Sequence, residues 1–274
     1  MIRDKDIEHY IRLHQHLASR KIAVPDIYWY DIEERIMVQE DLGNSSLYEL
    51  CISGFKLQEI YKQAIDELLR LQIDGRPGAP VTSRYDEEHI RWEQEYFQEF
   101  FLLQYCGITQ DALRNIEEDL AGIASRTRAL AEPISDYLMH RDFQSQNIYY
   151  KDARIRIIDF QSARIGPLTY DLGSLLKDAY VDIDQQAERV LFDYYYSGLR
   201  AKNIKITLEE LWQVYRLTAL QRGMQALGAF ANLSLNKNKK HFRKYIPRGV
   251  QLLMQGTEET EYKSLYAVLS SLKT

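Results

Sequence analysis

The stretch HRDFQSQNIYYKDARIRIIDFQ, residues 140–161, limits what this chain can fold into more than any other part of it. Its runs 148–150 and 155–158 are rich in β-forming residues around a charged turn, and they predict two short strands. A polar loop precedes the first strand, and Asp159 directly follows the second. Because a strand holds the side chain at its end with little freedom, the pattern indicates a site built on a small β cluster.

The spacing of oxygen-bearing side chains in this stretch favours phosphoryl transfer. Asp142 and Asn147 fit the pattern H-x-D-x-x-x-x-N, whose gap lets the loop turn so that Asp142 faces an acceptor and Asn147 faces a metal. Mg²⁺ prefers hard oxygen ligands, which Asn147 and Asp159 supply as an amide oxygen and a carboxylate. Taken alone, the loop has a second interpretation as a polar β-turn without a catalytic role.

The rest of the chain predicts one further hairpin and many helices. The hairpin is expected from two β-rich runs around a charged turn, at 27–31 and 35–41. Helical periodicity occurs at 4–20, 57–72, 86–105 and 109–131, and from about 169 onward with breaks near 202–205, 236–240 and Pro247. This order predicts an α+β fold with a mostly helical C-terminal body.

Composition argues against several classes of protein. The net charge of −5 argues against nucleic acid as the main partner. The only two cysteines, Cys51 and Cys106, lie far apart and outside any Cys/His cluster, so we expect neither a disulfide nor a zinc site. The N-terminus is charged and lacks an apolar signal segment, and no run of about 18 apolar residues occurs. We therefore expect a cytoplasmic protein that does not span a membrane.

Several motifs together resemble a known group of enzymes. HRDFQSQNIYY and the following IIDFQ resemble the catalytic and metal loops of the protein-kinase-like superfamily, in the form typical of its aminoglycoside phosphotransferase and choline kinase branch. SARIGPLTYDLGSLLKDAY, residues 162–180, and QRGMQALGAFANL, residues 221–233, resemble the bacterial cell-wall sugar kinases. Those enzymes phosphorylate N-acetylmuramate and N-acetylglucosamine on the anomeric hydroxyl. The resemblance extends from about residue 5 to the C-terminus.

The resemblance implies a role for each polar residue of the stretch. Asp142 would be the catalytic base, Asn147 and Asp159 would bind Mg²⁺, and His140 would hold the loop by packing and hydrogen bonding. Asp171 would be a buried carboxylate that accepts backbone N–H groups from the loop. The residues themselves support this last role, because a carboxylate is favoured at the start of a helix and needs several donors when it is buried.

The resemblance also implies contacts with a nucleotide and a substrate. The segment QEDLG would be a hinge whose backbone binds the adenine of ATP. The hinge residues are Glu40, Asp41 and Leu42. Possible substrate contacts are Arg141, Gln144 and Gln161.

The family places a Gly-rich loop and a Lys-bearing strand before the helix that begins here near residue 4. The first glycine of this chain is Gly43, and Glu8 is the candidate partner for such a Lys. We therefore expect a protein-kinase-like fold with an incomplete N-terminal lobe at 1–43, a mostly helical C-terminal lobe at 44–274, and weak activity of the chain as written. A shortened form of an active kinase, a natural short form and a basic residue supplied from elsewhere are three explanations that stay open.

The function that this implies is ATP-dependent and Mg²⁺-dependent phosphorylation of a small molecule, and the resemblance favours an amino sugar of cell-wall recycling. Two alternatives stay open: an aminoglycoside or choline-type phosphotransferase, and a non-catalytic kinase-like binding module. The acidic residues are dispersed, which favours a neutral or anionic sugar over a polycationic aminoglycoside. The hairpin at 27–41 is expected to have an unpaired edge, through which the chain could self-associate.

Overall fold

The computed structural model describes residues 6–53, 57–258 and 260–272. Within them the chain forms helices and three two-stranded antiparallel sheets, so the α+β class is as predicted. The chain divides into two compact units. The first comprises Met1–Arg84, Ile134–Leu176 and Ile183–Ile206, and the second comprises Tyr85–Pro133, Lys177–Asp182 and Thr207–Thr274. The predicted boundary between residues 43 and 44 lies inside the first unit, and the division into two lobes stays a prediction.

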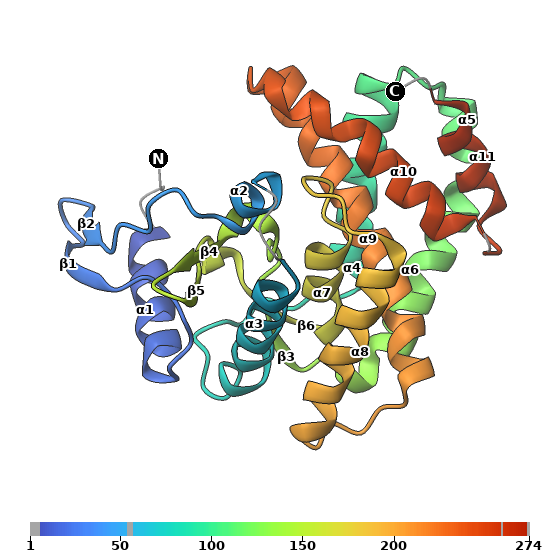
Figure 1. Cartoon of the computed structure of the whole chain (residues 1–274). Coiled ribbons are helices and arrows are strands. Elements are labelled where there is room, and N and C mark those ends of the chain that lie inside the picture. Colours follow the sequence, from blue (N-terminus) through green and yellow to red (C-terminus); the bar gives the residue numbers. More distant parts are fainter. Residues whose placement is uncertain (1–5, 54–56, 259, 273–274) are drawn as a thin grey trace. The chain divides into compact units, whose positions relative to one another are not determined.

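The first unit contains all the described strands and the elements that carry the predicted site (Figure 1). Its helices are α1 (Asp6–Ser19), α2 (Leu47–Ile52), α3 (Leu57–Leu69), α7 (Leu168–Leu176) and α8 (Gln185–Ala201), with the short helical segments η1 (Arg70–Asp74), η4 (Ser145–Asn147) and η5 (Phe160–Ser162). Its strands are β1 (Ile27–Asp31), β2 (Ile36–Gln39), β3 (Tyr137–Met139), β4 (Ile148–Lys151), β5 (Arg154–Ile157) and β6 (Arg164–Gly166).

All the regular secondary structure in the described residues of the second unit is helical. Its elements are α4 (Glu87–Tyr96), η2 (Phe97–Tyr105), α5 (Gln110–Arg114), α6 (Glu117–Ala131), α9 (Leu208–Asn236), η6 (Lys240–Tyr245), α10 (Ile246–Thr257) and α11 (Lys263–Ser271), and η3 (Glu132–Ile134) follows α6. The start of α9 is a capping box, in which Thr207 and Glu210 satisfy each other's backbone N–H groups. Gly228 lets α9 pass close to the neighbouring helix, since a Cβ there would lie 3.0 Å from the carbonyl oxygen of Tyr96.

The short strands around the predicted site pair in two ladders. In the first, β3 pairs with β6 and Leu138 lies opposite Ile165. In the second, β4 pairs with β5 through a two-residue turn, Asp152 and Ala153, at φ of 51° and 59°. Positive φ at both turn residues is the geometry whose twist suits a tight hairpin. The β4–β5 hairpin therefore separates the 140–147 loop from Asp159 by a compact, well-defined connection.

A buried core and a buried polar cluster stabilise the first unit. Leu13 and Leu17 of α1 and Ile65 of α3 have no exposed surface. Within the core, the hydroxyl of Tyr195 donates to the side-chain oxygen of Gln72 at 2.6 Å, and Gln72 Nε2 donates to the carbonyl oxygen of Leu168 at 2.8 Å. Each polar group in this cluster is thereby satisfied in a place where an unpaired one would cost about 1–3 kcal/mol. The cluster joins η1, α7 and α8.

The β1–β2 hairpin exposes apolar side chains. The side chains with large exposed fractions are Tyr28 at 66%, Trp29 at 51%, Ile36 at 50% and Val38 at 47%. Among the described residues, neither strand pairs with a third strand. Both edges of this ladder therefore offer backbone groups for further pairing, and self-association through them stays a prediction.

Three features of the structure differ in detail from the sequence-based expectation. Strand β6 was not predicted, because three residues are too short to show alternation. A non-helical break at 177–184 interrupts the C-terminal helices. The predicted helices at 57–72 and 86–105 end as π-helical segments, η1 and η2. No helix in the described part of the chain is both long and apolar enough to cross a membrane.

Candidate active site

The 140–147 loop is anchored by one buried carboxylate. Asp171, in the first turn of α7, has no exposed surface. Its Oδ2 accepts the backbone N–H of His140 at 2.7 Å, and its Oδ1 accepts that of Arg141 at 2.8 Å. A buried carboxylate is tolerated only where donors compensate for its lost hydration, and these two N–H groups are such donors. Asp171 thereby fixes the backbone immediately before Asp142.

His140 links this loop to the segment that contains Asp159. Its ring is buried, and its Nε2 lies 2.9 Å from the carbonyl oxygen of Ile158. Its Nδ1 lies 3.2 Å from the backbone nitrogen of Asp142. Burial lowers the pKa of His140 below its ordinary value, so the ring is neutral near pH 7. Only the tautomer with a proton on Nε2 satisfies both contacts, donating to Ile158 and accepting from Asp142.

Asn147 makes the second connection between the same two segments. Its side-chain Nδ2 donates to the carbonyl oxygen of Asp142 at 2.9 Å. Its own backbone carbonyl oxygen accepts the N–H of Ile158 at 3.0 Å. The first contact assigns Nδ2 to the loop and leaves Oδ1 as the acceptor atom of the amide. Asp142, Asn147 and Asp159 are therefore brought together by backbone-directed bonds.

Two residues of the site adopt left-handed backbone conformations. Arg141 has φ of 78°, and Asp159 has φ of 61°. Such values are uncommon outside glycine and persist where surrounding contacts enforce them. For Asp159 the neighbouring Phe160 provides such a contact, since it is fully buried and its ring stacks on Tyr10 of α1 at 4.7 Å between centroids. The carboxylate of Asp159 is exposed at the end of this tightly held turn.

The negative charge of Asp159 also acts on Tyr10, the residue on which Phe160 stacks. Burial and, second, the nearby charge of Asp159 raise the pKa of Tyr10 to about 12. The Tyr10 hydroxyl also lies 3.4 Å from the side-chain oxygen of Gln39 at the end of β2. Helix α1 therefore contacts both the Asp159 turn and the strand that leads into the predicted hinge.

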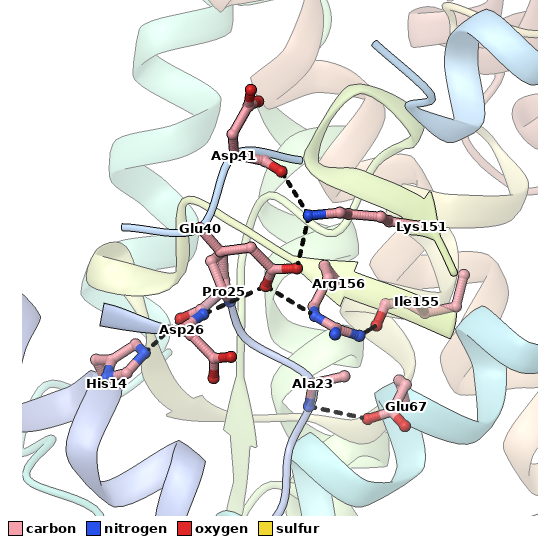
Figure 2. A network of polar contacts seen from close by, with 10 residues as sticks. All are labelled: His14, Ala23, Pro25, Asp26, Glu40, Asp41, Glu67, Lys151, Ile155 and Arg156. Carbon is pink, nitrogen blue, oxygen red and sulfur yellow. Dashed lines mark hydrogen bonds and ion pairs between the residues drawn. The ribbon is translucent and has the colours of Figure 1, made fainter. Parts of the chain in front are cut away.

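The predicted hinge is held by an ion-pair network that the sequence did not indicate (Figure 2). The carboxylate of Glu40 is 7% exposed and lies 3.1 Å from Lys151 Nζ and 3.1 Å from Arg156 Nε. Lys151 Nζ also donates to the carbonyl oxygen of Asp41 at 2.7 Å. Burial acts to raise the pKa of Glu40, but the bonds from Lys151 and Arg156 outweigh it, so the pKa is lowered.

This network ties the hinge to the metal residues of the predicted site. Lys151 ends β4, which begins directly after Asn147, and Arg156 lies in β5, which ends just before Asp159. One buried carboxylate therefore holds both strands of the hairpin that separates the two candidate ligands. In the sequence, Lys151 and Arg156 of YKDARIR could have revealed this network, but we interpreted the segment only as a charged turn.

The three predicted substrate contacts differ in their surroundings. The side-chain oxygen of Gln144 accepts the backbone N–H of Gln146 at 3.2 Å and caps η4. Gln161 Oε1 is buried and has no hydrogen-bond partner among the described residues. Arg141 and Gln161 line the same pocket of the first unit. Among the described residues, no group of three or more His, Cys, Asp or Glu side chains is arranged to hold a metal.

Comparison with known proteins identifies the family. The model of the phosphotransferase enzyme family matches residues 3–203. The chain is 30% identical over 238 residues to an N-acetylmuramate/N-acetylglucosamine kinase of Pseudomonas putida, covering 85% of this chain and 68% of the relative. It is 28% identical over 259 residues to a kinase of the same name from Neisseria meningitidis, covering 92% of this chain and 76% of the relative.

Solved structures show the same fold. A choline/ethanolamine kinase family protein from Mesorhizobium loti aligns with a TM-score of 0.66 at 15% identity, covering 98% of this chain and 83% of that protein. The complex of gentamicin with APH(2″)-IIa aligns with a TM-score of 0.61 at 16% identity, covering 95% of this chain and 83% of that protein. These likenesses confirm the predicted kinase-like fold. With a family match that spans residues 3–203, they show that this chain belongs to the phosphotransferase enzyme family.

Proposed function

We propose that this chain is an ATP-dependent kinase that phosphorylates a hydroxyl group of an amino sugar. The observation that carries the proposal is the pair of bonds made by Asn147, from its side chain to Asp142 and from the N–H of Ile158 to its carbonyl. These bonds join Asn147 to the backbone of Asp142 and to Ile158, the residue before Asp159. They support a site in which a candidate base and two candidate metal ligands lie on connected segments, because phosphoryl transfer depends on positioning. The relatives named N-acetylmuramate/N-acetylglucosamine kinase support the class of acceptor.

Each residue of the group has a distinct proposed task. Asp142 orients the acceptor hydroxyl and takes its proton. Its position follows from the contacts of its backbone with His140 and Asn147. Asn147 Oδ1 and the carboxylate of Asp159 are hard oxygen donors, and this donor set fits Mg²⁺. Bound Mg·ATP would supply the transferable phosphoryl group and neutralise its negative charge.

The contacts of the hinge narrow the proposed adenine site. The backbone N–H of Glu40 already donates to the carbonyl oxygen of Asp26 at 2.7 Å, and its carboxylate is held by the ion-pair network. We therefore assign recognition of the adenine to the backbone of Asp41 and Leu42. Glu40 sets the position of that backbone and does not itself bind the base.

The remaining parts of the proposal concern the acceptor, the lobes and the compartment. Arg141, Gln161 and the amide nitrogen of Gln144 are proposed acceptor contacts. Residues 1–43 are proposed as part of the nucleotide-binding lobe, and 44–274 as the lobe that carries the 140–147 loop and Asp159. Because the proposed donor is ATP and the proposed acceptor is an amino sugar, we place the reaction in the cytoplasm.

The acceptor is tested with a panel of hydroxyl compounds. N-acetylmuramate, N-acetylglucosamine, kanamycin and choline are each incubated with the protein and Mg·ATP, and the products are analysed by mass spectrometry and ³¹P NMR. We expect phosphate on one or both amino sugars. Phosphate on kanamycin or choline alone would refute the sugar assignment, and no product from any acceptor would favour a non-catalytic binding module.

The role of Asp142 is tested with a matched pair of variants. Asp142→Asn is nearly isosteric, and its backbone contacts with His140 and Asn147 are preserved, so we expect a loss of turnover of at least about 100-fold with a change in stability below about 1 kcal/mol. Asp152→Asn is the control, since it makes the same chemical change in the exposed β4–β5 turn. Equal turnover of the two variants would remove Asp142 from the mechanism.

A further inference from the structure

A basic segment of the second unit has no role in the function proposed above. It comprises residues 237–244, KNKKHFRK, and lies between α9 and α10 (Figure 1). The sequence contains no Asp or Glu from residue 211 to residue 257, although the net charge of the whole chain is −5. Positive charge is therefore concentrated in this basic segment, on a protein that is acidic overall.

Four cations of the basic segment are exposed and form no ion pair with a described residue. They are Lys237, Lys239, Lys240 and Arg243. By contrast, Arg248 at the start of α10 pairs with Asp182 at 2.6 Å. Like charges that lie close together in the sequence repel one another, and a bound anionic group removes this repulsion.

The end of α9 accounts for only part of this cluster. Lys237 is the C-cap of α9, where the helix dipole favours a cation. The effect of the dipole declines within the last turn of a helix, and Lys240 and Arg243 belong to the separate helical segment η6. The basic segment therefore carries more positive charge than the end of this helix explains.

Aromatic packing holds the backbone of the basic segment against α9. The ring of Phe242 stacks on Phe230 of α9 at 5.8 Å between centroids, and Tyr245 is buried with its ring 5.9 Å from that of Phe230. The backbone N–H of Lys239 donates to the carbonyl oxygen of Leu233 at 3.0 Å. A partner that binds here therefore has little backbone to order, which lowers the entropic cost of binding.

The kind of cation favours carboxylates as the groups that are bound. Three of the four exposed cations are lysines, and an ammonium group pairs with a carboxylate as a point charge that needs no fixed geometry. Sites that select phosphate groups favour arginine, whose planar fork binds two oxygens at once. A row of Lys side chains over a short segment suits the Asp and Glu side chains of an acidic peptide.

The surroundings of the basic segment argue against two other polyanions. A single-stranded nucleic acid stacks its bases on exposed aromatic rings, but the Phe and Tyr rings of η6 pack against α9. A membrane surface binds segments that also insert an apolar face. In the described stretch 231–247, Leu235, at 38%, is the only exposed large apolar side chain.

We propose that the basic segment is a docking surface for an acidic segment of a partner protein, whose Asp and Glu side chains pair with Lys237, Lys239, Lys240 and Arg243. This goes beyond the proposed kinase reaction and does not depend on it, because the residues proposed for that reaction belong to the first unit.

The experiment follows the fluorescence anisotropy of a labelled octaglutamate peptide titrated with the whole chain. We expect saturable binding that weakens as salt is added. The combined variant Lys237→Gln, Lys239→Gln and Lys240→Gln should bind about tenfold more weakly, because it loses three exposed ion pairs. Combining Lys239→Arg with Lys240→Arg keeps the charge and should keep the binding.

A matched variant separates this surface from net charge alone. Lys21→Gln, Arg154→Gln and Lys205→Gln together remove the same number of charges from exposed positions of the first unit. We expect this control to bind the peptide within twofold of the wild type. Circular dichroism first shows that each variant is folded.

The other occupants are tested in the same buffer. A thymidine oligonucleotide of equal charge and vesicles of phosphatidylglycerol and phosphatidylcholine replace the peptide, and analytical ultracentrifugation follows self-association. Tighter binding to either polyanion, or self-association, that the combined Lys→Gln variant of the basic segment abolishes would overturn the proposal. No saturable binding of octaglutamate, undiminished binding in that folded variant, or an equal loss in the control would also overturn it. None of these readouts requires kinase activity.

Discussion

Replacing Asp171 with Asn tests whether one buried carboxylate holds the 140–147 loop in place. The two oxygens of Asp171 accept the N–H groups of His140 and Arg141 at 2.7 and 2.8 Å. Asparagine has the same shape, but it has one oxygen and one NH₂ group. Whichever way the amide is turned, an NH₂ group then faces one of the two backbone N–H donors, and that donor loses its acceptor.

The magnitude follows from these two contacts. Losing a hydrogen bond to a charged group costs about 1.5–3 kcal/mol, and leaving a buried donor unpaired costs about 1–3 kcal/mol. Removing a buried charge returns part of this, because the desolvation of the carboxylate is no longer required. We therefore expect a net loss of about 3 kcal/mol in the free energy that closes the loop. This corresponds to a roughly 100-fold larger equilibrium constant for opening of the loop at the backbone of His140 and Arg141.

The assay is amide hydrogen exchange of His140 and Arg141, together with turnover of the same variant. We expect exchange at both amides to rise by about 100-fold and turnover to fall with it, because Asp142 loses its fixed position. Asp184→Asn is the control. Asp184 caps α8 by accepting the N–H of Ala187 at 2.7 Å, and Asn caps a helix as well as Asp does. Unchanged exchange at His140 and Arg141 in a folded Asp171→Asn protein would refute the reasoning.

Two further predictions concern charge. Glu40→Gln removes the carboxylate that pairs with Lys151 and Arg156, and it should lower the free energy of unfolding by about 1–3 kcal/mol in a urea titration at pH 7. Because the pKa of Glu40 is lowered, the stabilisation by this carboxylate is present above about pH 4.5 and is lost as pH falls through the folded-state pKa. Equal stability of variant and wild type at pH 7 would contradict this prediction. The pKa of His140 is also lowered, so the stability that its neutral ring contributes is fully present above about pH 6.5 and declines as pH falls towards the folded-state pKa. In urea titrations at several pH values, His140→Gln should reduce the change of the midpoint with pH below about pH 6.5. An unchanged slope in this variant would contradict the neutral ring.

Much of the fold could be predicted because its signals are local. The hairpin at 27–41 follows from two β-rich runs and the helix at 4–20 from helical periodicity, and the structure has them at Ile27–Gln39 and Asp6–Ser19. The strand β6 could not be predicted, since its three residues pair with β3 only after the chain has folded. The proposed roles of Asp142, Asn147 and Asp159 are predictions that rest on their spacing and on the resemblance of the two loops. The structure adds bonds from Asn147 to Asp142 and to Ile158, the residue before Asp159.

The sequence by itself determined the order of elements and the local pattern of the site, because strand ends and loop spacing are properties of neighbouring residues. Only the tertiary structure decided which distant groups meet. Glu40 pairs with Lys151 across 111 positions and with Arg156 across 116, and no periodicity encodes such a contact. The same holds for the pocket that Arg141 and Gln161 line, which also takes residues from α1 and from the segment 80–83. Long-range pairs of charges depend on how the whole chain packs, and a local pattern does not contain that information.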